Sequence, residues 1–325
     1  MDDALSTPDL PPPLPTNTPN YVSYGGEQVF QQPYSARDTQ LYAFILPIES
    51  DKRALPQALL DRVLNRPSNG RLDCRLALPF ALLSFQHFGA LGALGPPDEH
   101  KGSFAYNEAT LWLPVVDHNR PGLNFCYFVP YIFADNHFAI AAGREVYGYP
   151  KALGQIEMPL SPQDDLSFRL TTEAIPHFAS GAIGQPATLI EVTPTIRPQS
   201  PQTPWQRWEH AAQHLVEHVA GDGVDAMMEF IAKEIFRPQV QMVFLKQFRD
   251  AANGARACYQ AIVEGAGSIT EFKGGLPLGE FDVLINPLDS HPVCGELGLE
   301  ARLRAHGFFI EFSFDILAGR EVSTI

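Results

Sequence analysis

The feature that most constrains this chain is a series of short aromatic and β-branched segments, bounded by Pro, Gly or Asn. Such segments are typical of β-strands. They are LYAFIL (41–46), AYNEATLWLPVV (105–116), NFCYFVPYIFAD (124–135), HFAIAAGREVYGYP (137–150), DLSFRLTTEA (165–174), ATLIEVTPTI (187–196), VQMVFLKQF (240–248), ACYQAIVEGAG (257–267) and GFFIEFSFDI (307–316). Because they do not alternate regularly with helical patterns, they favour an antiparallel sheet, sandwich or barrel over a doubly wound fold.

Helical patterns are confined to two stretches. PQALLDRVLN (56–65) predicts an amphipathic helix with a leucine-rich stripe. Residues 204–236 predict two helices that are interrupted at GDG (221–223). Residues 1–20 are acidic and rich in proline, which predicts a disordered tail. We therefore predict one domain over residues 21–325, with a helical insert at about 204–236.

The charge of the chain bears on its partners. The net charge is −14, with a pI of about 5.1, and nothing offsets the repulsion from a polyanion such as nucleic acid. No secretory signal pattern is visible, and the most apolar stretch, LALPFALLSF (76–85), is about half the ~20 residues of a membrane-spanning helix. We expect a cytoplasmic protein that binds neither nucleic acid nor membrane.

Familiar site motifs are absent or incomplete. His210, His214 and His218 share one face of a predicted helix, but no cysteine or acidic cluster nearby completes a metal site. A solvated face or an oligomer contact explains these histidines better. The sequence contains neither G-x-x-x-x-G-K-[ST] nor G-x-S-x-G. The four cysteines are far apart and form no C-x-x-C motif, which indicates free thiols.

Two charged residues have uncommon settings. Lys151 follows YGYP and precedes ALG, so its neighbours are aromatic, apolar or conformationally special. It could be a turn lysine whose stem packs on Tyr149 while its amine contacts water. Alternatively, an amine in an apolar cavity loses its proton more easily, because desolvation disfavours the ammonium form, and a neutral amine forms Schiff bases with ketones. Glu108 lies within a predicted strand, where it is either exposed or faces into the structure.

The motif around this lysine resembles a known signature. GREVYGYPKALG (143–154) is similar to that of the acetoacetate decarboxylase family, where Gly-Arg-Glu precedes an aromatic residue and Pro-Lys-Lys-Leu-Gly. In that family the first lysine after the proline forms the Schiff base, and this position is Lys151. YNEATLWLPV resembles the strand that carries an active-site glutamate, here Glu108. SARDTQLYAF resembles an N-terminal strand whose arginine faces the site, here Arg37.

Two positions depart from the family pattern. The family's second lysine, which lowers the pKa of the first, is replaced by Ala152. The family also has a carboxylate in the segment before the Glu108 strand, whereas this chain has none between Asp73 and Asp98. Both changes predict a drier and less charged pocket, in which desolvation alone must activate the amine.

The resemblance implies a fold and a reaction. The fold is mainly β (α+β), a largely antiparallel closed sheet or barrel in a homo-oligomer. The reaction is that of a lyase without metal or organic cofactor, which decarboxylates acetoacetate or a related β-keto acid through an iminium on Lys151. Glu108 would move protons, Arg37 would orient the carboxylate, and Tyr147 and Tyr149 would line the substrate pocket. Two alternatives stay open: a Schiff-base aldolase or dehydratase of the same superfamily, and a non-catalytic small-molecule binding protein.

Overall fold

A computed structural model describes residue 21 and the ranges 30–120, 124–195 and 239–324. The predicted tail, the insert at 204–236 and its three histidines lie outside these residues. Within the described ranges, no helix is both long and apolar enough to cross a bilayer.

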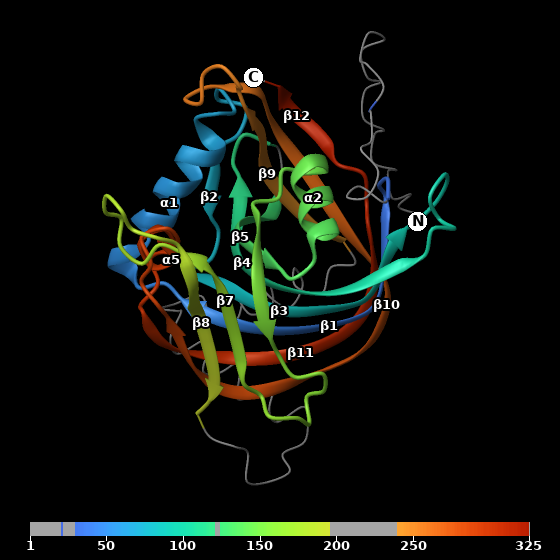
Figure 1. The fold of residues 1–325 in the computed structure, drawn as a ribbon, viewed down its shortest axis with the longest axis vertical. Coiled ribbons are helices and arrows are strands. Elements are labelled where there is room, and N and C mark those ends of the chain that lie inside the picture. Colours follow the sequence, from blue (N-terminus) through green and yellow to red (C-terminus); the bar gives the residue numbers. More distant parts are fainter. Residues whose placement is uncertain (1–20, 22–29, 121–123, 196–238, 325) are drawn as a thin grey trace, which may run out of the picture.

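A twelve-stranded sheet dominates the structure (Figure 1). Its strands are β1 (Tyr34–Pro47), β2 (Cys74–Leu76), β3 (Phe80–Ala93), β4 (Ser103–Asp117), β5 (Phe125–Ala134), β6 (Lys151–Glu157), β7 (Phe168–Ala174), β8 (Gln185–Pro194), β9 (Gln239–Arg249), β10 (Ala257–Ile285), β11 (Arg302–Ile316) and β12 (Arg320–Thr324). The described helical segments are η1 (Ser50–Lys52), α1 (Ala54–Leu60), its π-helical continuation η2 (Asp61–Asn65), α2 (His137–Val146) and α5 (Val293–Leu297). The prediction of a mainly β fold is confirmed.

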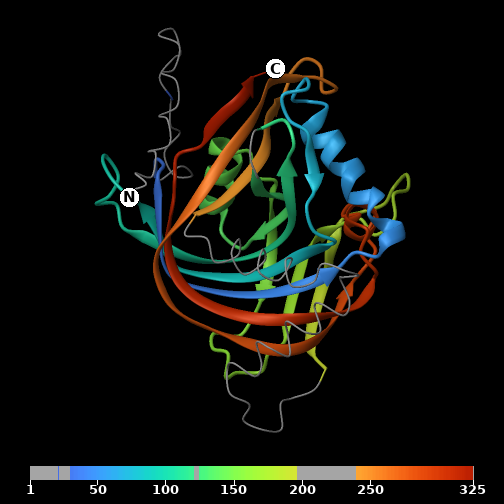
Figure 2. The ribbon, with the colours of Figure 1, turned by 180° about the vertical axis from the view of Figure 1, so that it is seen from behind.

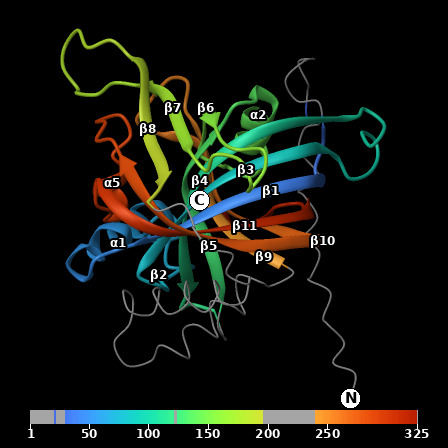
Figure 3. The ribbon, with the colours of Figure 1, turned by 90° about the horizontal axis from the view of Figure 1, so that it is seen from below.

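The strands follow one another around a ring. Their order is β2-β4-β3-β1-β11-β10-β8-β7-β6-β5-β9, and additional pairings join β4 to β5 and β10 to β9. Most neighbours are antiparallel, but β5 runs parallel to both β6 and β9. The long strands β3, β1, β11 and β10 lie side by side and curve together across the molecule (Figures 2 and 3). The sheet is therefore mixed, and its ring of strands does not form a clear barrel.

One predicted strand is wrong. We expected residues 137–150 to be extended, but His137–Val146 form helix α2. The side chain of Asn136 accepts hydrogen bonds from the backbone N–H groups of Phe138 and Ala139, which caps the first turn. The segment also contains three alanines, the residue with the highest helix propensity. The cap and the alanines outweigh the β-like aromatic character on which the prediction rested.

The alternation of side chains along β4 divides the interior into two parts. Ala109, Leu111, Leu113 and Val115 point to one face and join the main hydrophobic core. The residues between them point to the other face, where Tyr106, Glu108, Thr110 and Trp112 line a cavity. Successive residues of a strand face opposite sides of the sheet, so one strand serves both core and cavity.

Phe44 gives a test of the main core. It is completely buried, and its ring contacts those of Phe85, Phe168 and Phe281. We expect Phe44→Ala to lower the free energy of unfolding by about 3–5 kcal/mol, because it leaves a large cavity. Phe178→Ala is the matched control, since Phe178 is 66% exposed and its loss should change stability by less than about 0.5 kcal/mol. Urea unfolding of both variants checks the expectation, and equal stabilities would contradict this assignment of the core.

Candidate active site

A tight turn carries the chain from α2 to Lys151, the first residue of β6. Gly148 in this turn has φ +76°, and a β-carbon there would lie 2.5 Å from the α-carbon of Lys246. Only glycine satisfies both the positive φ and the close approach of the two backbones. Lys151 then pairs with Ile132 of β5 in parallel register. The glycine three residues before the lysine thus lets this turn pass directly against the backbone of β9.

Two residues of the Gly-Arg-Glu motif hold Lys151 in place. Arg144 donates a hydrogen bond of 3.0 Å to the backbone carbonyl oxygen of Lys151. A β-carbon at Gly143 would lie 3.0 Å from both Cδ and Cε of Lys151 and 3.1 Å from the Tyr149 ring. Glycine within a helix costs roughly 1 kcal/mol relative to alanine. Its presence in α2 is explained by the lysine stem that packs against it.

The Lys151 amine meets Glu108 inside the structure. Nζ lies 2.6 Å from Oε2 of Glu108, and the two side chains are only 6% and 8% exposed. Glu108 also accepts hydrogen bonds from Thr110, at 3.1 Å to Oε1, and from Tyr106, at 3.4 Å to Oε2. Buried charges occur in proteins when they are paired and hydrogen-bonded, and this pair satisfies both conditions. The structure thus shows the Lys151 amine in the interior rather than in water, and Glu108 facing into the structure rather than exposed.

Two tyrosine rings flank the amine. Nζ of Lys151 lies 5.3 Å from the centroid of Tyr106 and 5.7 Å from that of Tyr149. Burial, and secondly the negative charge of Glu108, raise the pKa of both phenols well above the ordinary value. Both hydroxyls therefore stay protonated near neutral pH and can donate hydrogen bonds. The Tyr149 hydroxyl is buried, and no group in the described residues accepts its hydrogen bond.

A large apolar cavity opens beside the pair. Its volume is about 550 Å³, and strands β1, β3, β4, β5, β9, β10 and β11 contribute to its walls. Leu41, Leu82, Trp112, Phe308 and Ile310 are among the apolar side chains that line it. Lys151 is the only cationic side chain among the described lining residues. In the part of the chain that the structure describes, no three His, Cys, Asp or Glu residues are grouped as a metal site.

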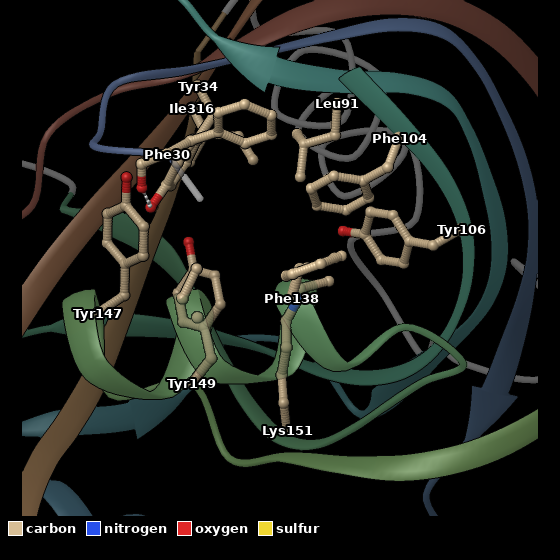
Figure 4. Close-up of a pocket in the computed structure, with 13 residues that line it drawn as sticks. Phe30, Tyr34, Leu91, Phe104, Tyr106, Phe138, Tyr147, Tyr149, Lys151 and Ile316 are labelled. Carbon is tan, nitrogen blue, oxygen red and sulfur yellow. Dashed lines mark hydrogen bonds between the residues drawn. The ribbon is translucent and has the colours of Figure 1, made fainter. Parts of the chain in front are cut away.

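A much smaller pocket also adjoins Lys151 (Figure 4). It has a volume of about 30 Å³, and its walls are almost entirely aromatic and aliphatic. Lys151, Tyr106, Tyr149 and Ile316 line both this pocket and the large cavity. The hydroxyl groups of Tyr106 and Tyr149 point toward the interior of the small pocket (Figure 4). Two spaces of very different size thus adjoin the same lysine.

Arg37 is not brought to this pair, contrary to our expectation. Its guanidinium forms an ion pair with Asp315 at 2.8 Å, donates a hydrogen bond to the Phe314 carbonyl oxygen, and is 38% exposed. Arg37 lines neither the cavity nor the small pocket. Its neighbour Ala36 is fully buried, and the strand register shifts at Asp38, whose φ is +51°. Strand alternation beside this bulge directs the arginine away from the amine.

The two predicted tyrosines occupy different positions. Tyr149 lines both spaces, as stated above. Tyr147 lines only the small pocket, donates a hydrogen bond to the Leu317 carbonyl oxygen, and stacks on Tyr149 with ring centroids 4.8 Å apart. Tyr147 therefore supports the ring of Tyr149 from behind. That either tyrosine binds substrate stays a prediction.

The sequence analysis missed several residues that contact the pair. Tyr106 and Thr110 stand two residues before and after Glu108, so strand periodicity alone could have placed them on the same face. Gln86 lies directly opposite Glu108 in the register of β3 and β4, is 5% exposed and lines the cavity. Only tertiary structure reveals this neighbour. It is a neutral amide, so the described part of this wall adds no second carboxylate beside Glu108.

The geometry thus defines a strand-rich protein that encloses a buried lysine–carboxylate pair in an apolar cavity. Residues 76–222 match the family model described as acetoacetate decarboxylase (ADC). No curated protein matches the sequence. The solved structures considered next have 13–15% sequence identity to the chain, a level at which likeness concerns the fold.

Three solved structures share the fold. The acetoacetate decarboxylase of Legionella pneumophila subsp. pneumophila str. Philadelphia 1 has 15% identity and a TM-score of 0.58, with 96% of this chain and 94% of that chain covered. An acetoacetate decarboxylase-like enzyme from Sphingomonas wittichii RW1 has 14% identity and a TM-score of 0.51, with 90% and 94% covered. The enduracididine biosynthesis enzyme MppR, complexed with the condensation product of pyruvate and imidazole 4-carboxaldehyde, has 13% identity and a TM-score of 0.52, with 94% and 98% covered. The family resemblance is confirmed: the chain carries an acetoacetate decarboxylase family match and an acetoacetate decarboxylase-like fold.

Gly143→Ala tests the positioning of the lysine. Alanine favours a helix by roughly 1 kcal/mol over glycine, but its methyl group would press on the Lys151 stem. We therefore expect the unfolding free energy of Gly143→Ala to rise by less than roughly 1 kcal/mol. We also expect the displaced lysine to form its reductive adduct with a ketone at least about tenfold more slowly. Ala141→Gly, two positions earlier in α2, is the matched control and should lower stability while leaving the adduct rate unchanged. If the unfolding free energy rose by the full amount of roughly 1 kcal/mol and the rate of adduct formation did not change, the proposed contact between residue 143 and the Lys151 stem would be contradicted.

Proposed function

We propose that this protein is a Schiff-base-forming lyase that decarboxylates a β-keto acid through an iminium on Lys151. The observation that carries the proposal is the 2.6 Å contact between the Lys151 amine and the Glu108 carboxylate in an apolar cavity. An amine must be neutral to attack a carbonyl carbon, and a carboxylate in contact with it is a ready acceptor for its proton. Transfer of this proton from the ammonium to the carboxylate would leave the neutral amine that the attack requires.

The first half of the reaction forms the iminium. The neutral amine of Lys151 attacks the ketone carbon, and the carbonyl oxygen takes up the proton held by Glu108 to give a carbinolamine. The positively charged nitrogen of this adduct then returns one proton to the Glu108 carboxylate, and Glu108 delivers that proton to the hydroxyl group, which leaves as water. Tyr106 and Tyr149 flank the amine with hydroxyl groups that stay protonated and would donate hydrogen bonds to the leaving oxygen. The result is a C=N⁺ bond between substrate and lysine.

The second half releases CO₂ and the ketone. The electron pair of the breaking C–C bond moves into the iminium, so the positive nitrogen and the negative carboxylate give a neutral enamine and neutral CO₂. A step that cancels two charges is favoured where water is excluded. Lys151 is the only cation among the described residues lining either space, which suits this step. Protonation of the enamine carbon and hydrolysis of the iminium then return the free lysine.

Other features of the function stay predictions. We infer a cytoplasmic homo-oligomer that takes a small-molecule keto acid and needs no organic cofactor. Arg37 is left out of the reaction, because its guanidinium is held by Asp315. The substrate carboxylate would instead meet the tyrosine hydroxyls and the iminium nitrogen.

Trapping with borohydride tests the proposal. Incubation with acetoacetate and then borohydride should reduce the iminium and leave an adduct on the peptide that contains Lys151, and Lys151→Met should abolish it. Lys246 is an internal control, since burial lowers the pKa of that amine, whose Nζ lies 5.5 Å from the centroid of the Tyr259 ring. Labelling of Lys246 in place of Lys151, or of neither lysine with any keto acid, would leave a non-catalytic binding protein as the better reading.

Glu108→Gln tests the proton acceptor. The amide cannot take the lysine proton, so we expect the rate of adduct formation to fall by about 10²–10⁴-fold. Glu157→Gln is the matched control: this glutamate lies on β6, is 54% exposed and should not affect the rate. Urea unfolding separates this effect from instability, because removal of one partner leaves a buried charge. An unchanged rate in folded Glu108→Gln would exclude the carboxylate as the base.

A second candidate function uses the same iminium for aldol chemistry. It is supported by the MppR structure, whose ligand is a condensation product of pyruvate. An enamine derived from pyruvate could attack an aldehyde in the large cavity in place of protonation. Formation of a Lys151 adduct with pyruvate, together with no CO₂ release from any β-keto acid, would favour this reaction over decarboxylation.

A further inference from the structure

We propose that the substrate is a β-keto acid with an extended apolar substituent on its ketone carbon, an alkyl chain or aryl group of about five or more carbons. This inference rests on the proposed function and narrows its substrate class. The large cavity holds the apolar substituent, and the small aromatic pocket holds the carboxylate end. Acetoacetate, which has only a methyl group at this position, would leave most of the cavity unused.

The size of the cavity is the first reason. An apolar cavity of about 150 Å³ accommodates benzene. The space beside Lys151 measures about 550 Å³, within the range of pockets that bind drug-sized ligands. A methyl group could not exclude water from such a volume. The absence of water is what the lysine–glutamate pair requires in order to exchange its proton, so a substrate that fills the cavity also favours the chemistry.

The strand register shows where the substituent would run. Glu108 lies opposite Gln86, which lies opposite Leu41, which lies opposite Ile310. These four residues, one on each of four neighbouring strands, form a row across the sheet. The row starts at the Glu108 carboxylate and ends in the apolar side chains of Leu41 and Ile310. Strands are about 4.8 Å apart, so the row extends for roughly 14 Å along the sheet. This length exceeds what acetoacetate needs and suits an extended chain.

The next row has the same character. Thr110, which donates a hydrogen bond to Glu108, lies opposite Ser84, and this serine lies opposite Ala43, which pairs with Phe308. Ser84 accepts a hydrogen bond from the indole N–H of Trp112, so its hydroxyl is engaged in the wall. Polar groups therefore cluster at the lysine end, and the far end offers only apolar contacts.

The small pocket fixes the orientation. At about 30 Å³ it has room for little more than one water-sized group, so it could take a carboxylate or the departing CO₂ but no longer substituent. The unpartnered Tyr149 hydroxyl is a hydrogen-bond donor for a carboxylate oxygen at this place. With the carboxylate on this side of Lys151, the remaining substituent of the ketone carbon faces the large cavity.

A chain-length series tests the inference. The probes are acetoacetate, 3-oxohexanoate and 3-oxooctanoate, and the readout is kcat/KM for CO₂ release by the full-length protein. Each buried methylene should raise kcat/KM about fourfold, so 3-oxooctanoate should exceed acetoacetate on the order of 100-fold. Equal values across the series, or a decrease with length, would overturn the proposal.

Ala43→Phe provides the matched change in the protein. Ala43 is buried on the cavity side, away from the lysine, and a phenyl group there would occupy part of the substituent's space. We expect the kcat/KM ratio of 3-oxooctanoate to acetoacetate to fall at least about tenfold. Ala251→Phe, in an exposed loop, should leave the ratio unchanged. If Ala43→Phe does not fold, Ala43→Leu makes a smaller change of the same kind.

Direct binding separates this inference from the proposed function. 2-Nonanone and acetone carry no carboxylate, and their affinities for Lys151→Met can be measured by calorimetry without a Schiff base. Tight binding of 2-nonanone, weakened by Ala43→Phe in the same background, would support the cavity assignment even if no adduct formed at Lys151. Adduct formation with acetoacetate but no preference for 2-nonanone over acetone would support the enzyme and overturn the substrate class.

Discussion

The contact between the Lys151 amine and the Glu108 carboxylate is the interaction on which the rest of the site depends. Two opposite charges removed from water are stable only if they meet closely and if their remaining polar atoms have partners. The 2.6 Å contact meets the first condition, and hydrogen bonds from Thr110 and Tyr106 to the carboxylate help to meet the second. The local structure explains how two residues 43 positions apart are brought together. A capped helix, a glycine turn and an arginine that binds the lysine carbonyl hold one partner, and strand β4 holds the other.

The cavity follows from the same strand that supplies the glutamate. One face of β4 is apolar and completes the main core, so the position and twist of the strand are determined by packing rather than by the site. The other face is then free to carry Tyr106, Glu108 and Thr110. Because the Glu108 carboxylate sits on an element that the core holds rigidly, its distance to the amine does not depend on a mobile loop.

Local patterns predicted most of the strands and the lysine, and tertiary contacts decided the rest. The aromatic and β-branched residues of segment 165–174 indicated β7, and the motif GREVYGYPKALG led to Lys151. The prediction of a strand over 137–150 was wrong, because aromatic and β-branched content cannot reveal that Asn136 would cap a helix. Arg37 misled because a bulge one residue later changes which way its neighbours face. Gln86 was invisible, since only the pairing of β3 with β4 places it beside Glu108.

The structure changes how the replacement of the family's second lysine by Ala152 is interpreted. Lys151 and Ala152 are successive residues of β6, so their side chains leave opposite faces of the strand. Lys151 enters the cavity, whereas Ala152 packs against the main hydrophobic core and pairs with Phe133 of β5. A lysine at 152 in this structure would therefore extend into the core, with the sheet between its ammonium and the amine of Lys151. Its absence removes no cation from the cavity, and in the proposed reaction Glu108 is the group that takes the proton of the amine. In the same proposal, the apolar substituent of the substrate fills the space that the sheet encloses.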